Sequence, residues 1–89
     1  MSETKITYFP NGQKKEEVTF KDGEEFERTE WTYHDNGQKE SQLSWKHLYE
    51  QDGFWTRWYE NGQKAYEETW IDGILLITKQ WDRDGNLIE

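Results

Sequence analysis

The chain has 89 residues, enough for one domain, with no cysteine and a formal net charge of −8. The missing cysteine excludes disulfides and thiolate chemistry, and the acidic balance disfavours nucleic acid and anionic membranes as direct ligands. Aliphatic residues are few, but six Trp, five Tyr and four Phe supply the apolar surface that an ordered fold needs.

The predicted elements are short strands from one end of the chain to the other. Side chains alternate with period 2, and no segment has the i, i+3, i+4, i+7 apolar pattern of a helix. Pro10 stands just before the first turn, where it costs no ladder hydrogen bond. In chain order the strands are expected at residues 4–9, 14–20, 26–34, 39–45, 54–59, 64–70, 75–81 and 86–89.

The turns between these strands repeat. The motif Asn-Gly-Gln-Lys begins at Asn11, Asn36 and Asn61, and Asp84-Gly85-Asn86-Leu87 is a degenerate fourth copy. Asn-Gly between alternating runs is a strong hairpin signal, and a period of about 25 residues is typical of repeat architectures. We predict an all-β fold: a single antiparallel meander sheet of repeated β-hairpins with about eight short strands. Residues 1–89 form one repeat domain of about three and a half units, with turns at 11–12, 36–37, 61–62 and 84–85.

A second series of turns joins the hairpins. It is expected at Asp22-Gly23 and at Asp72-Gly73. The middle repeat has Lys46-His47-Leu48 at this place, and a compensating turn is expected at Asp52-Gly53.

Aligning the repeats on their Asn-Gly turns places the aromatic residues in two columns. The first contains Tyr8, Tyr33, Trp58 and Trp81, and the second contains Phe20, Trp45 and Trp70. Most of these rings are expected to be core, as cross-strand pairs worth roughly 0.2–1 kcal/mol each. Eight short strands in one layer cannot cover both faces of the sheet, so some rings should stay exposed. Whether the columns share a face depends on the register of the turns, which the sequence leaves open.

The units Trp58-Tyr59-Glu60-Asn61-Gly62-Gln63-Lys64, Phe20-Lys21-Asp22-Gly23 and Gly53-Phe54-Trp55-Thr56-Arg57-Trp58 resemble the variant MORN repeat (MORN_2). That repeat is typical of bacterial proteins described as YwqK-type antitoxins. The resemblance extends from Tyr8 to Leu87. It implies a repetitive sheet of β-hairpins, no catalytic residues, and a role in protein interaction or dimerisation. The antitoxin description implies that the protein binds and silences a toxic partner.

No catalytic or metal-binding set is evident. His34 aligns with Phe9 and Tyr59, so its expected role is one more flat ring of the repeat, and His47 is expected to be solvated in a turn. With two His and no Cys, a zinc site would need carboxylate ligands, and no such spacing occurs. We therefore expect no enzymatic activity, no cofactor and no metal.

The leading hypothesis is a non-enzymatic protein-binding module: a small acidic antitoxin or inhibitor that masks a basic or nucleic-acid-binding partner protein, such as a toxin or nuclease. Aromatic rings dominate interface hot spots, and acidic residues would steer a basic partner. The expected anchors are Trp31, Trp55, Trp58, Tyr59 and Trp81. The expected steering residues are Glu24, Glu25, Glu27 and Glu30.

Two other functions stay open. The alternative is a structural or assembly repeat module that acts through homodimerisation or scaffolding, and exposed rings would also suit a carbohydrate. The sheet edges, near Lys5–Phe9 and Asn86–Glu89, are short and charged and are expected to be protected, although either could still pair with another strand. The N-terminal sequence lacks the features of a secretory signal, and no apolar stretch reaches the roughly 20 residues that span a bilayer. A cytoplasmic protein without a membrane span or direct nucleic-acid contact is expected.

Overall fold

The computed structural model describes residues 2–46 and 50–88, and every regular element in these residues is a β-strand. The strands are β1 (Ser2–Tyr8), β2 (Lys14–Lys21), β3 (Glu24–Tyr33), β4 (Lys39–Lys46), β5 (Glu50–Gln51), β6 (Gly53–Trp58), β7 (Lys64–Ile71), β8 (Ile74–Trp81) and β9 (Leu87–Ile88). The expected strands are thus confirmed, and β5 adds a two-residue strand. Positions 47 and 48 of the expected middle turn lie outside the described residues. The compensating turn expected at Asp52-Gly53 is wrong, because the chain continues there from β5 into β6 alongside β4.

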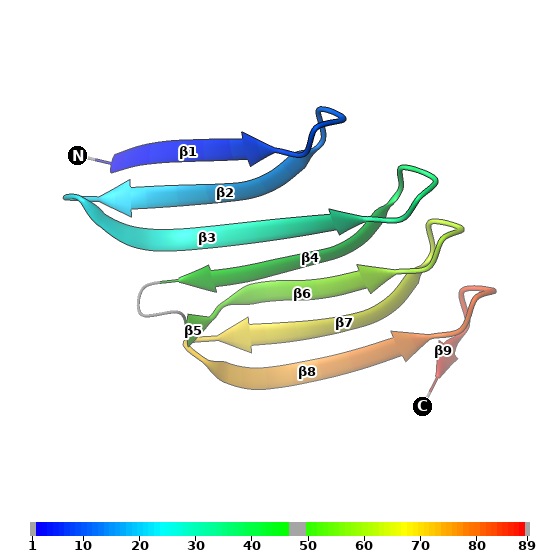
Figure 1. Ribbon diagram of the computed structural model, residues 1–89. Helices are drawn as coiled ribbons and strands as arrows, with labels where there is room; N and C mark the ends of the chain where they lie inside the picture. The colour runs from blue at the N-terminus through cyan, green and yellow to red at the C-terminus, as the bar shows by residue number, and fades with distance from the viewer. Residues whose placement is uncertain (1, 47–49, 89) are drawn as a thin grey trace.

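The strands form one open antiparallel sheet (Figure 1). Their order is β1-β2-β3-β4-β6-β7-β8-β9, and β5 pairs with the end of β4. Neighbours in the sheet are neighbours in the chain, as predicted for a meander. The sheet measures 45 × 34 × 14 Å, so the described residues form a single layer. The predicted fold class is confirmed.

The four Asn-Gly-type turns have the same backbone hydrogen bonds. In the first, the Phe9 amide donates to the Gln13 carbonyl (2.8 Å) and the Gly12 amide donates to the Phe9 carbonyl (2.9 Å). The Asn11 side chain accepts from the Gln13 amide (3.0 Å). Gly12 has φ +91°, a left-handed conformation that side chains disfavour. The side-chain acceptor explains the Asn of the motif, and the left-handed backbone explains the Gly. The same backbone bonds recur at His34, Tyr59 and Asp82.

The hairpins are joined at the opposite end of the sheet by tighter turns. Asp22-Gly23 and Asp72-Gly73 have positive φ at both residues, 53° and 82° in the first and 52° and 79° in the second. Two left-handed residues in succession are the signature of the type I′ hairpin, which matches the twist of the flanking strands.

A β-bulge next to each of the first three Asn-Gly turns sets the faces of the sheet. Tyr8 pairs with Lys14 while Thr7 pairs with Glu16, so Lys15 is an extra residue. Equivalent register shifts follow Thr32 and Arg57. The sequence left open whether the two aromatic columns share a face. The bulges place the rings of the first and second columns on opposite faces. In β1, for example, Glu3 and Tyr8 point to opposite faces, and Glu3 is the partner of Phe20.

Little of this single layer is buried. Among the described residues, the buried apolar side chains are Val18 (5 % exposed) and Trp31 (9 %), and the buried polar ones are Ser41 and Thr56. Val18 and Trp31 lie on opposite faces, because Val18 pairs with Arg28 and Trp31 is three positions further along the same strand. The described residues contain no helix with the length and apolarity needed to cross a membrane.

Candidate protein-binding surface

One face of the sheet carries a row of tryptophans across β4, β6 and β7. The rings of Trp45 and Trp55 pack edge to face with centroids 5.0 Å apart, and Trp55 and Trp70 are 6.1 Å apart. The Trp55 indole donates to the Ser44 carbonyl at 2.6 Å. These contacts fix the rings in place and join three strands. All three rings are half-buried, so part of each faces solvent.

A carboxylate lies beside these rings. Glu68 pairs with Trp55 across the strands and accepts from the Tyr66 hydroxyl (2.6 Å) and from the Trp70 indole (3.1 Å). The hydrogen bond to Glu68, with some desolvation, raises the pKa of Tyr66 above its ordinary value, so the phenol stays neutral. Within residues 2–46 and 50–88, Glu68 forms no ion pair, and its charge is held by neutral donors. The row Trp45, Trp55, Trp70, Tyr66 and Glu68 is the centre of the tryptophan–glutamate face.

Three more glutamates extend this face towards β2. Arg28 pairs with Trp45 across the strands, and its guanidinium contacts Glu25 at 2.7 Å, Glu16 at 2.9 Å and Glu30 at 3.6 Å. The hydrogen bond to Glu25 is the main reason that the pKa of Arg28 is raised. Three carboxylates around one guanidinium leave an excess of negative charge here. The tryptophan–glutamate face is therefore aromatic at its centre and acidic on its β2–β3 side.

The opposite face has a different pattern, in which lysines alternate with rings. Lys14 lies over Trp31 (5.5 Å to the ring centroid), Lys39 over Trp58 (5.8 Å) and Lys64 over Trp81 (5.9 Å). Each is the lysine of an Asn-Gly-Gln-Lys motif, and its cation–π contact reaches the next unit of the repeat. We call this the lysine–tryptophan face. These repeated contacts explain why the fourth residue of the motif is lysine.

The predicted anchors and steering residues do not form one patch. Trp55, Glu25 and Glu30 lie on the tryptophan–glutamate face. On the other side of the sheet are Trp31, Trp58, Trp81, Glu24 and Glu27. Trp31 is buried, so little of its ring is open to a partner. The sequence interpretation did not include Trp45, Trp70, Tyr66 and Glu68, although the second aromatic column contained the signal for two of them.

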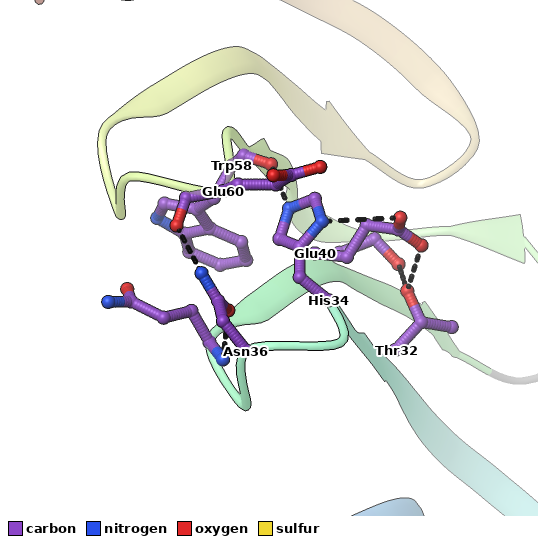
Figure 2. Close-up of polar contacts among 8 residues, drawn as sticks. Thr32, His34, Asn36, Glu40, Trp58 and Glu60 are labelled. Carbon is purple, nitrogen blue, oxygen red and sulfur yellow. Dashed lines mark hydrogen bonds and ion pairs between the residues drawn. The ribbon is translucent and has the colours of Figure 1, made fainter.

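Tyr59 and His34 belong to neither face, because they lie in the turns, and their side chains connect one turn to the next. Figure 2 shows this for His34. The His34 Nε2 atom bonds the Trp58 carbonyl at 2.8 Å, and the Asn36 amide donates to the Glu60 carbonyl at 2.7 Å. His34 is thus a hydrogen-bonding group as well as a ring. One unit further, the Tyr59 hydroxyl donates to the Trp81 carbonyl at 2.7 Å. Side chains of one turn therefore hold the backbone of the next.

The C-terminal edge of the sheet differs from expectation. The short strand β9 pairs with Gln80 and Trp81, so within the described residues most of the outer edge of β8 has no strand beside it (Figure 1). The expectation of a short, charged edge concerned Asn86–Glu89, whereas the open part of the edge lies in β8 and is apolar. Its exposed side chains are Ile74, Leu75, Leu76 and Ile77, each 43–62 % exposed. A long apolar edge is a template for pairing with another strand.

Comparison with known proteins gives one family. A family model described as MORN repeat variant matches residues 4–22, 30–47 and 51–72, together more than half of the chain. Each match contains one Asn-Gly turn. No curated protein and no solved structure shows significant similarity. Within the described residues, no three His, Asp or Glu side chains lie close enough together to hold a metal ion.

Proposed function

Because the chain belongs to the MORN repeat variant family, whose repeats suggest a non-catalytic module, we propose that it is a protein-binding module: a small acidic inhibitor, of the YwqK antitoxin type, that masks a basic partner protein. The partner uses this basic surface for its own activity, as a nuclease or another nucleic-acid-binding toxin does. Occupying the surface silences the partner without chemistry.

The observation that carries this proposal is the tryptophan–glutamate face. It combines half-buried rings, which supply large contact area at low entropic cost, with carboxylates in excess over bases. None of the described elements forms a second layer over it. A basic partner would be attracted by the glutamates and held by the rings. The lysine–tryptophan face suits such a partner less, since Lys14, Lys39 and Lys64 are on it.

A second candidate function rests on the apolar edge of β8. Two copies of the chain could pair through Ile74–Ile77, which would hide exposed apolar side chains and satisfy free backbone groups. The chain would then be an assembly module.

The test is affinity capture from source-cell lysate with matched variants. The double variant E16Q/E68Q removes two charges from the tryptophan–glutamate face, and E17Q/E67Q removes two charges at neighbouring positions of the other face. We expect a single basic protein that is recovered at low salt and reduced at high salt. Its affinity should fall about tenfold or more with E16Q/E68Q, a loss of about 1.4 kcal/mol, and much less with E17Q/E67Q.

Two results would contradict this proposal. Equal losses in both double variants would mean that total charge matters and the face does not. Recovery of only untagged copies of the chain itself would favour the assembly module over the inhibitor. Removing the charge of Glu68 would then have no effect on recovery.

A further inference from the structure

A groove of about 400 Å³ lies between the first and second Asn-Gly turns. Two aromatic rings line it, those of Phe9 and Tyr33, whose centroids are 6.0 Å apart with the rings nearly perpendicular. Its polar lining includes Asn11, Asp35 and the backbone at Gly37. The groove therefore offers rings, a carboxylate and peptide carbonyls within one small space.

The other pairs of turns have smaller hollows, of about 300 and 220 Å³, and side-chain bonds cross from one turn to the next beside them. Asn36 and Asn61 donate to the Glu60 and Arg83 carbonyls, at 2.7 and 2.8 Å. In the first turn Asn11 donates instead to the side chain of Gln13, at 2.9 Å. Among the described residues, the one side chain of the first turn that donates across to the second is Gln13, whose side-chain amide donates to the Gly37 carbonyl at 2.9 Å.

Two acceptors are consequently left without their cross-turn donors. The Tyr33 and Asp35 carbonyls correspond to those of Trp58 and Glu60, which accept from His34 and Asn36. Phe9, at the place of His34, has no polar side-chain atom. In the part of the chain that the structure describes, no side chain of the first turn donates to either carbonyl.

The last pair of turns shows what fits beside such a ring. There the Arg83 guanidinium lies over the Tyr59 ring, with its Cζ atom 5.3 Å from the centroid. Tyr59 corresponds to Phe9, and Arg83 corresponds to Asp35 in the second turn. The first groove thus has a ring and an acid where the last pair of turns has a ring and a guanidinium. Among the residues described, the Asp35 carboxylate has neither an ion pair nor a hydrogen bond.

We propose that this groove binds an arginine side chain of the basic partner, beside Phe9 and against Asp35, at the place that Arg83 takes in the last pair of turns. This inference rests on the proposed function and names the group that the partner inserts. A guanidinium is planar, stacks on rings and donates five hydrogen bonds, enough for the carboxylate and both carbonyls. An ammonium group is compact and more strongly hydrated, so lysine fits less well. The Lys15 ammonium lies 5.8 Å from the Phe9 centroid, but Lys15 belongs to the same hairpin as Phe9. Arg83 and Asp35 each come from the turn that follows the ring, so Lys15 does not take the place that corresponds to Arg83.

The test is NMR titration of the ¹⁵N-labelled protein with three capped tripeptides, Gly-Arg-Gly, Gly-Lys-Gly and Gly-citrulline-Gly. Citrulline keeps the shape of arginine without its charge. We expect the amide signals of Asp35 and Gly37 to shift with the arginine peptide at millimolar concentration. The lysine peptide should bind more weakly, and the citrulline peptide at least about tenfold more weakly, because it lacks the charge that the carboxylate attracts.

Two variants make the assignment specific. D35R supplies an internal guanidinium, as Arg83 does, and should abolish the shifts, whereas D35N should weaken binding several-fold. The matched control is E60R, at the equivalent position of the third turn, which should leave the arginine peptide bound. Equal binding of the citrulline peptide, unchanged binding in D35R, or no shift at Asp35 and Gly37 would each overturn the assignment.

The two proposals can fail separately. If the groove fails this test while the captured partner still depends on Glu16 and Glu68, only the groove assignment is lost. If the arginine peptide binds but no basic partner is recovered, the proposed function fails and the groove stands as an arginine site.

Discussion

Trp31→Ala is expected to cost about 3 kcal/mol or more of the free energy of unfolding. Trp31 is 9 % exposed and is the largest buried side chain among the described residues. A single-layer sheet has no second layer that could move in to fill the space. Domains of this kind have only about 5–15 kcal/mol of stability, so the variant should lose a large fraction of its free energy of unfolding. Urea unfolding followed by far-UV circular dichroism measures the loss.

The matched control for this prediction is Trp58→Ala. Trp58 has the same kind of lysine over its ring as Trp31, but it is only half-buried. Its loss of stability should therefore be clearly smaller. If both variants lose the same amount, or Trp31→Ala loses under about 1 kcal/mol, Trp31 is not the centre of the fold.

Arg28→Met is expected to destabilise the chain by about 1.5–3 kcal/mol at low salt, the range for hydrogen bonds to charged groups. The guanidinium is the only base in contact with Glu16, Glu25 and Glu30 among the described residues. Methionine keeps much of the apolar stem but leaves three carboxylates close together. Because their repulsion is electrostatic, about 1 M salt should recover a large part of the loss.

Arg57→Met is the control for charge alone. Arg57 is exposed on the same face, and no ion pair of Arg57 occurs within the described ranges. Its replacement should change stability by under about 0.5 kcal/mol. A loss in Arg28→Met that is identical at low and high salt would mean that packing, not charge, explains the role of Arg28.

The sequence predicts the meander and its turns because both are local. Asn-Gly-Gln has one main use, a left-handed glycine with an Asn side chain that accepts from the backbone two residues on, and the period of the motif orders the hairpins. The strands follow from alternation between those turns. The fold class was therefore predicted correctly without any long-range information.

The faces of the sheet were not predictable in the same way. One extra residue in each of the first three Asn-Gly hairpins, such as Lys15, reverses which side the following side chains occupy, and nothing in the alternation marks it. Trp55 and Trp58 were therefore placed in one expected surface, although they lie on opposite faces. The open edge of β8 was missed because its exposure depends on how short β9 is.

The most direct test of the account uses the six tryptophans, three on each face. The indole N–H signals of the ¹⁵N-labelled protein would be recorded alone and with the partner recovered by capture. If the tryptophan–glutamate face is the docking surface, the signals of Trp45, Trp55 and Trp70 shift or broaden, and those of Trp31, Trp58 and Trp81 stay. The reverse pattern, or no change in any of the six, would contradict it.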